Sequence, residues 1–146
     1  MQFDQRETIG FQAAQLARLM TIRLRDALAP IGLMPAQSAA LIEIGRAEGL
    51  TQKQLVERLD VEQPGVARTL NGLEADGWIV RQAKAGRAQG LFLTDKAKTV
   101  VPEAMRIAAD INRRALNELS RTEQAHLIDA LDELIHDLKA HHQEVR

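Results

Sequence analysis

The chain has 146 residues, of which 45% are hydrophobic and only 3% aromatic, so it suits one domain of ordinary size with a mostly aliphatic core. The formal net charge is −1, and affinity for a polyanion would therefore have to come from the local placement of charge. The absence of cysteine excludes a disulfide framework, a thiolate metal site and a cysteine redox sensor.

The sequence shows no targeting or membrane signal. The first residues lack the basic and then apolar segment that is typical of a signal peptide. No apolar run approaches the ~20 residues that a membrane-spanning helix needs. We therefore expect a soluble, cytoplasmic protein that does not associate with a membrane.

A long amphipathic helix is predicted over the first thirty residues. Apolar residues recur there at the three- and four-residue intervals of one helix face: Ile9, Ala13, Leu16, Met20, Leu24 and Leu28. Pro30 and Gly32 end this pattern. The apolar face has no obvious partner in the segment that follows, so we expect it to pack on a second subunit. Packing on the chain's own C-terminal helices is the alternative.

Two shorter helices are predicted next. The first begins at Pro35, because proline is well tolerated in a first helical turn, and it continues to Arg46. The second begins after Thr51, which has the spacing of a capping box with Gln54. The dipeptide Asp60-Val61 then forms a turn.

A fourth helix is predicted from about Glu62 to the residue before Gly77, with Pro64 in its first turn. Three apolar residues at i, i+4 and i+7 form its inner face: Val66, Leu70 and Leu73. The other faces carry the residues that could meet a ligand: Gln63, Gly65, Arg68, Thr69 and Asn71.

Two strand-like segments follow, Trp78 to Arg81 and Leu91 to Thr94, and the polar loop between them carries Lys84 and Arg87. A hairpin with a basic tip beside two short helices is the geometry of a wing that reaches phosphates or the minor groove. The order of these elements predicts a winged helix-turn-helix that docks on duplex DNA.

The charge of the winged segment is a weak signal by itself. Residues 51–94 contain six Lys or Arg and five Asp or Glu, a net charge of +1. Pairs of helices joined by a turn also occur with no nucleic acid nearby. We therefore keep a second interpretation, a winged-helix protein-interaction module without specific DNA binding.

Two long helices are predicted after the hairpin. The first begins at Thr94 and runs to about Leu119, and Pro102 either kinks it or marks its real start. The second follows Ser120 and Glu123, which have the spacing of a capping box. Its apolar residues repeat at four, three and four, with two isoleucines beside them: Leu127, Leu131, Leu134, Leu138, Ile128 and Ile135. Burial against a partner is the natural use of such a seam.

No catalytic constellation is present in the sequence. Among the four histidines only His141 and His142 are close, and adjacent residues point in different directions on a helix. Solvated histidines are therefore favoured over a metal site between subunits. Ser38 and Ser120 are the only serines, and Ser38 has no nucleophile motif around it. We predict that the chain is not an enzyme and holds no metal or cofactor.

The segment from Glu62 to Arg81, with Arg87 and Leu93-Thr94 after it, resembles the MarR family of winged helix-turn-helix transcriptional regulators. The similarity in length and layout extends over nearly the whole chain. The family's wing usually has an Asp two residues before its Arg, and this chain has Ala85 there. Gly72 stands where the family often has a basic residue. Both departures remove polar support from the DNA-binding region.

This resemblance implies a single, mainly α MarR-like domain with a small β-hairpin wing. Residues 35–98 would form the winged helix-turn-helix, and helices from residues 1–33 and 100–146 would form the dimerisation domain. Two copies would place their recognition helices in successive major grooves of a pseudo-palindromic operator, roughly 34 Å apart. The sequence therefore predicts a homodimeric, sequence-specific repressor of transcription.

Several residues are predicted to contact DNA. Arg68 is the first choice for base readout, because a bidentate contact to guanine contributes roughly 1–3 kcal/mol of discrimination. Gln63 could read adenine, while Pro64 and Gly65 let the helix end approach a thymine methyl closely. The remaining candidates contact phosphates from the helices or follow the wing: Thr51, Gln52, Thr69, Arg81, Lys84 and Arg87.

The resemblance also implies control by a small ligand. Members of the family often bind aromatic or phenolic acids in a cleft between the winged domain and the dimer helices, which shifts the recognition helices and weakens DNA affinity. In this chain the cleft would be lined by Met20, Arg23 and Met105. The chain has no tyrosine and few aromatic residues, so a regulator that has lost its ligand is the alternative.

Overall fold

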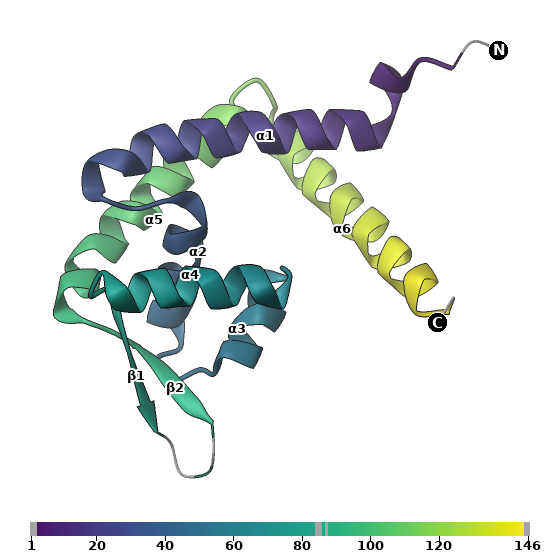
Figure 1. Cartoon of the computed structure of the whole chain (residues 1–146). Coiled ribbons are helices and arrows are strands. Elements are labelled where there is room, and N and C mark those ends of the chain that lie inside the picture. Colours follow the sequence, from purple (N-terminus) through teal and green to yellow (C-terminus); the bar gives the residue numbers. More distant parts are fainter. Residues whose placement is uncertain (1–2, 84–85, 87, 145–146) are drawn as a thin grey trace. The chain divides into compact units, whose positions relative to one another are not determined.

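The computed structural model describes residues 3–83, 86 and 88–144, with side chains as far as residue 142. The elements follow one another in this order (Figure 1): η1 (Gln5–Glu7), α1 (Ile9–Leu28), η2 (Ala29–Ile31), α2 (Pro35–Arg46), α3 (Gln52–Leu59), α4 (Gln63–Ala75), β1 (Ile79–Ala83), β2 (Gln89–Leu93), α5 (Asp95–Ala115) and α6 (Arg121–Glu144). They divide into two compact units, Met1–Ile111 and Asn112–Arg146. The mainly helical chain with one hairpin confirms the predicted fold class.

The first helix, α1, is shorter than the helix that the sequence pattern predicts over the first thirty residues. The hydroxyl of Thr8 accepts a hydrogen bond from the amide of Phe11 at 3.2 Å and so begins α1, after the separate 3-10 turn η1. The helix tightens into the 3-10 turn η2 around Pro30 and ends at Gly32, which has a φ of 77°. Such a positive φ favours glycine, so the chain reverses direction here at little conformational cost.

The helix-turn-helix is built by local capping, as the sequence predicts. The hydroxyl of Thr51 accepts from the amide of Gln54 at 3.2 Å, and the Gln54 side chain accepts from the amide of Thr51 at 2.9 Å. At the start of α2, Met34 has no capping oxygen, and the side chain of Gln37 accepts from its amide at 2.9 Å. Asp60 ends α3 in the left-handed region, with a φ of 53°.

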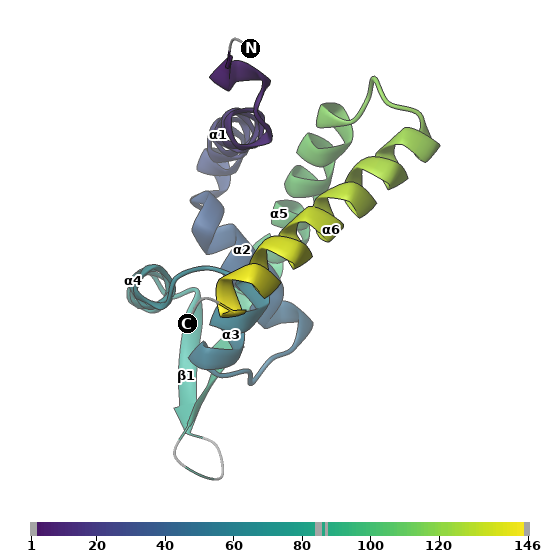
Figure 2. The same ribbon diagram turned by 90° about the vertical axis from the view of Figure 1, so that its right-hand side faces the viewer.

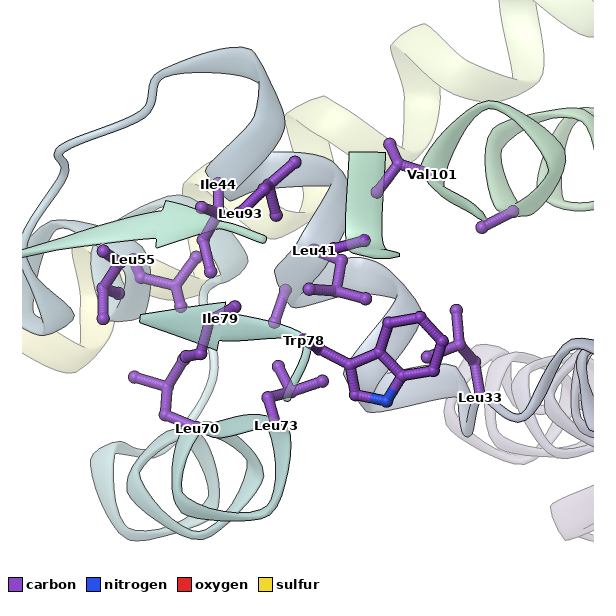
Figure 3. Packing of buried hydrophobic residues seen from close by; sticks show 14 of the residues in the cluster. Leu33, Leu41, Ile44, Leu55, Leu70, Leu73, Trp78, Ile79, Leu93 and Val101 are labelled. Atoms are coloured by element: carbon purple, nitrogen blue, oxygen red, sulfur yellow. The ribbon is translucent and has the colours of Figure 1, made fainter. Parts of the chain in front are cut away.

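One aliphatic core holds the first unit together (Figure 3). Its side chains come from every element of the winged region, and the labelled ones include Leu41, Ile44, Leu55, Leu70, Leu73, Ile79, Leu93 and Val101. The predicted inner face of α4 is confirmed, because its three apolar residues are all buried. Full burial of one such side chain contributes roughly 1.5–3 kcal/mol, so this core fixes α4 against the rest of the unit.

The two strands pair antiparallel, with Ile79 opposite Leu93 and Arg81 opposite Leu91. In both views β1 leaves the end of α4 (Figures 1 and 2). Strand β2 also pairs on its other edge, where the amide of Leu91 donates to Leu50 O at 2.9 Å and the amide of Gly49 donates to Leu91 O at 2.8 Å. Gly49 has a φ of 90°, which favours glycine at this joint.

A short connection, residues 116–120, joins α5 to α6. Helix α5 continues through Pro102 but ends at Ala115, four residues before the predicted end at Leu119. The side chain of Gln124 explains the early end, because its Nε2 donates to Leu116 O at 3.1 Å and to Leu119 O at 3.0 Å and closes a turn instead of a helix. The predicted capping box of Ser120 and Glu123 then begins α6.

Large apolar side chains remain exposed on the terminal helices. On α1, Ile9 is 63% exposed and Leu16 51%. Along the described side chains of α6 none is buried, and its exposed apolar residues are Leu127, Ile128, Leu134, Ile135 and Leu138. In the described part of the chain no single helix is long and apolar enough to cross a membrane, although the bent pair Ile9–Ile31 and Pro35–Arg46 passes that test of length and composition together.

Replacing Gly72 with Ala is expected to raise the free energy of unfolding by roughly 0.5–1 kcal/mol, because glycine is unfavourable inside a helix. The added Cβ would meet only the Gln37 amide, at 3.9 Å, which is ordinary contact. Gly77→Ala is the matched opposite case, since its φ of 76° strains any L side chain by roughly 1–2 kcal/mol. Urea denaturation of both variants tests this, and a destabilised Gly72→Ala would contradict it.

Candidate nucleic-acid interface

The first turn of α4 presents three predicted contact residues together. Gln63, Pro64 and Gly65 are all exposed, and the side chain of the N-cap residue Glu62 does not cap the helix. A Cβ built on Gly65 meets nothing within 4 Å, so the fold does not require glycine there. The start of the helix is therefore narrow, uncapped by a side chain and open to a ligand that approaches closely.

Arg68 stands one turn further along α4 and is exposed. In the described part of the chain no hydrogen bond or ion pair holds its guanidinium. Thr69 beside it is half-buried. The geometry leaves the five donors of Arg68 available for a planar, two-acceptor partner such as a guanine edge.

Arg81 is held differently from Arg68. Its side chain is only 20% exposed and lies where α3, α4 and β1 meet. Nη1 donates to Gln52 Oε1 at 3.3 Å, and Nη2 donates to Asn71 Oδ1 at 3.0 Å. Nε is buried and faces Glu74 Oε2 at 3.6 Å, which is an ion-pair distance but too long for a hydrogen bond. Two of the five donors of this predicted phosphate contact are therefore hydrogen-bonded to protein oxygens, and its Nε faces a carboxylate.

The other predicted contacts fall in two places. Thr51 and Gln52 lie half-buried at the start of α3, where the Thr51 hydroxyl is already engaged as a cap. Lys84 and Arg87, like Ala85 between them, lie outside the described residues. The structure therefore joins two of the predicted contacts, Gln52 and Arg81, by a hydrogen bond, and the wing contacts stay predictions.

The base of the wing is anchored by a carboxylate that the sequence pattern does not reveal. Glu48 Oε1 accepts a hydrogen bond from the amide of Leu93 at 3.0 Å. At the same end of the hairpin, Thr94 Oγ1 donates to Gly77 O at 2.7 Å. Lys96 Nζ donates to Asp76 O at 2.8 Å and lies 4.0 Å from the centroid of the neighbouring indole ring. These contacts tie the hairpin to the connection between α2 and α3, to the end of α4 and to the start of α5.

The predicted effector residues all belong to the first unit. Met20 is half-buried, whereas Arg23 and Met105 are exposed. Next to Met105, the Arg106 guanidinium donates two hydrogen bonds to Glu103 and lowers the pKa of that carboxyl. Arg106 is therefore already paired with a carboxylate, whereas the predicted Arg23 is exposed.

Metal chemistry finds no support in the described residues, among which no three His, Asp or Glu side chains are grouped closely enough to hold an ion. The two adjacent histidines of the sequence lie on α6, where His141 Nδ1 is 2.7 Å from Asp137 O. This contact engages a nitrogen that a metal would otherwise use.

A capped helix, a turn, a recognition helix and a two-stranded wing, packed on one core, define a winged helix-turn-helix protein. A profile described as the MarR family matches residues 31–88. The chain is 32% identical over 122 residues to the uncharacterized HTH-type transcriptional regulator YwoH of Bacillus subtilis (strain 168), a match that covers 84% of this chain and 82% of that protein. The chain belongs to the MarR family of transcriptional regulators, so the predicted family is confirmed.

Solved structures agree with this assignment. The transcriptional regulator PA3341 is 31% identical, with a TM-score of 0.80 over 91% of this chain and 99% of that chain. A MarR-family regulator from Listeria monocytogenes, solved with a 26mer DNA, shares the fold at 23% identity, with a TM-score of 0.83 over 90% of this chain and 89% of that chain. Other proteins of this fold were solved with p-coumaroyl-CoA and with salicylic acid. These relatives are regulators and not enzymes, which confirms the prediction that the chain has no catalytic role.

Replacing Glu48 with Ala is expected to lower the free energy of unfolding by about 1 kcal/mol and to speed amide exchange at Leu93, because that amide loses its acceptor. Glu48→Gln keeps an oxygen in the same place and is expected to retain most of the protection. Glu57→Ala, an exposed glutamate of α3, is the control. Unchanged exchange at Leu93 in Glu48→Ala would show that the bond does not hold the wing.

Proposed function

We propose that this regulator acts as a homodimeric repressor that binds a pseudo-palindromic operator and is released by a small aromatic or phenolic acid. Residues 35–98 form its DNA-binding region, and helices from residues 1–33 and 100–146 form its dimerisation domain. It works in the cytoplasm, where its operator is accessible. Its partners are duplex DNA, a second copy of the chain and the effector.

The unengaged guanidinium of Arg68 is the observation that carries this proposal. A buried or paired arginine cannot read bases without breaking its own contacts, and Arg68 has none to break among the described residues. It lies on the same helix as the exposed Gly65, which allows close approach of a groove edge. Binding in the major groove requires both base readout, here by Arg68, and close approach of the first turn of α4 to the base edges.

Dimerisation is supported by the unpartnered apolar side chains of the terminal helices. Leu138 of α6 is 73% exposed, and the exposed residues of α6 repeat with the spacing of a helix-packing seam. Exposed apolar side chains repeated along two helices are unusual for a monomeric protein and mark interaction surfaces. Two-fold pairing would also set two recognition helices at the spacing of a helical turn of DNA.

The proposal is tested by fluorescence anisotropy with labelled DNA from upstream of the protein's own gene, against scrambled DNA, at several salt concentrations. Specific binding should favour the native sequence, involve two chains per site and weaken steeply with salt, because phosphate contacts release counterions. Equal and salt-insensitive binding to both DNAs, repeated in a genome-wide selection, would instead support the protein-interaction module.

Arg68→Ala is expected to lower affinity for the preferred site by roughly 10- to 100-fold per contacted base. The preference for that site over scrambled DNA should fall as well. Arg68→Lys keeps the charge but loses the two-donor geometry, so it should retain salt dependence and lose preference. Arg46→Ala, which removes an exposed arginine at the end of α2, is the control. Unchanged preference in Arg68→Ala would remove Arg68 from base readout.

Release by an effector is supported by the complexes of proteins of this fold with salicylic acid and with p-coumaroyl-CoA, the thioester of an aromatic acid. It is also supported by the exposed Arg23, whose cation could pair with a carboxylate. An effector weakens DNA binding only if it binds the DNA-free conformation more tightly. Salicylate is therefore the first probe, because it combines one ring with one carboxylate.

We expect salicylate to release DNA from the wild-type protein, and Arg23→Ala to raise the concentration needed for half-release by roughly tenfold, the loss of one charged hydrogen bond. DNA affinity without salicylate should stay unchanged. Arg18→Ala removes an exposed arginine from the same helix and is the matched control. Equal shifts in the two variants would place the acid elsewhere.

A further inference from the structure

Arg81 orients two side-chain amides that lie on either side of it. The guanidinium has donors and no acceptor, so each amide must turn its oxygen toward Arg81. Gln52 Oε1 and Asn71 Oδ1 are the two acceptors, at 3.3 Å and 3.0 Å. Among the described residues no partner holds the nitrogen of either amide. Both amides thus keep their NH2 donors available.

The position of these donors suits the sugar-phosphate backbone. Asn71 is exposed and lies three residues after Arg68 on α4, which places both on one face of the helix. Gln52 lies at the start of α3, the helix that in this motif crosses the backbone of the duplex. Phosphate oxygens accept hydrogen bonds only, so they match two donors whose own oxygens are occupied.

We infer that Asn71 is a DNA-contacting residue that donates, together with Gln52, to backbone phosphate oxygens, and that Arg81 is the positioning residue that holds both amides in this orientation. This inference rests on the proposed function. It reassigns Arg81 from direct phosphate contact to support, because its guanidinium is largely buried and faces Gln52, Asn71 and Glu74. A phosphate that took the two donors now directed at Gln52 and Asn71 would break both of these hydrogen bonds.

Asn71→Asp separates a DNA role from a structural one. The carboxylate keeps an oxygen acceptor for Arg81 but loses the NH2 donor and repels phosphate. We expect thermal stability at or above that of the wild type, with affinity lower by roughly tenfold or more for native and scrambled DNA alike. Ala39→Glu, at an exposed position of α2, is the control for added negative charge and should bind normally.

Arg81→Lys separates positioning from direct contact. Lysine keeps the charge but cannot hold two amides in a fixed plane, so affinity should fall with the salt slope unchanged. The double variant Asn71→Ala, Arg81→Lys should bind DNA as tightly as the weaker-binding of the two single variants. No further affinity is lost because the two residues act as a unit. Stability is measured alongside, so that a folding defect is distinguished from a binding defect.

Three results would overturn the inference. Wild-type affinity in Asn71→Asp would remove the donor role, and a loss confined to the native sequence would make Asn71 a base reader. The third result combines two variants: Arg81→Lys keeps full DNA affinity, and Arg81→Ala lowers the salt dependence of binding by about one phosphate contact for each bound copy. That result would make Arg81 itself the phosphate contact. A wild-type protein that binds no DNA would contradict the proposed function as well, whereas these variant results leave that function intact.

Discussion

Strand β2 forms hydrogen bonds on both of its edges, and the geometry of the winged helix-turn-helix depends on this double pairing. One edge meets β1, and the other meets Gly49 and Leu50 in the connection between α2 and α3. Glu48 extends the second edge by accepting from the amide of Leu93. A strand with both edges satisfied has no exposed edge that invites pairing with another chain, and it transmits the position of α2 and α3 directly to the hairpin.

The core and the Arg81 contacts then constrain α4 from two sides. Leucines of its inner face anchor the helix in the aliphatic core, which sets its depth and tilt. The contacts of Arg81 with Asn71 and Glu74 join its outer side to β1, and the contact with Gln52 joins both to α3. A close-packed core resists small displacements, so the exposed side chains of α4 are presented on a rigid support.

Features that depend on neighbours in sequence were predictable, because their physics is local. The capping boxes at Thr51 and Ser120 are separated from their partners by three residues, and the inner face of α4 follows from helical periodicity. Contacts between distant residues were not. Glu48 meets Leu93 across 45 residues and Gln52 meets Arg81 across 29, and neither spacing carries a pattern.

The candidate site shows the same division between local and distant information. Exposure of Gln63, Gly65 and Arg68 on α4 follows from the period of the helix. The hydrogen bonds of Arg81 depend on three elements that meet only in the folded chain. The sequence shows Arg81 only as a basic residue, and this led to the prediction of a phosphate contact. Asn71 carried one usable signal, which is its place three residues after Arg68 on the outer face.

The packing of Trp78 has a practical consequence. This residue is 6% exposed, lies between the end of α4 and the start of β1, and contacts the Lys96 ammonium. It is the only tryptophan, and the chain has no tyrosine. Intrinsic tryptophan emission therefore comes from a single side chain, which lies at the joint between recognition helix and wing. A change in the environment of that joint alters the emission spectrum of the protein, so the joint can be followed without an added label.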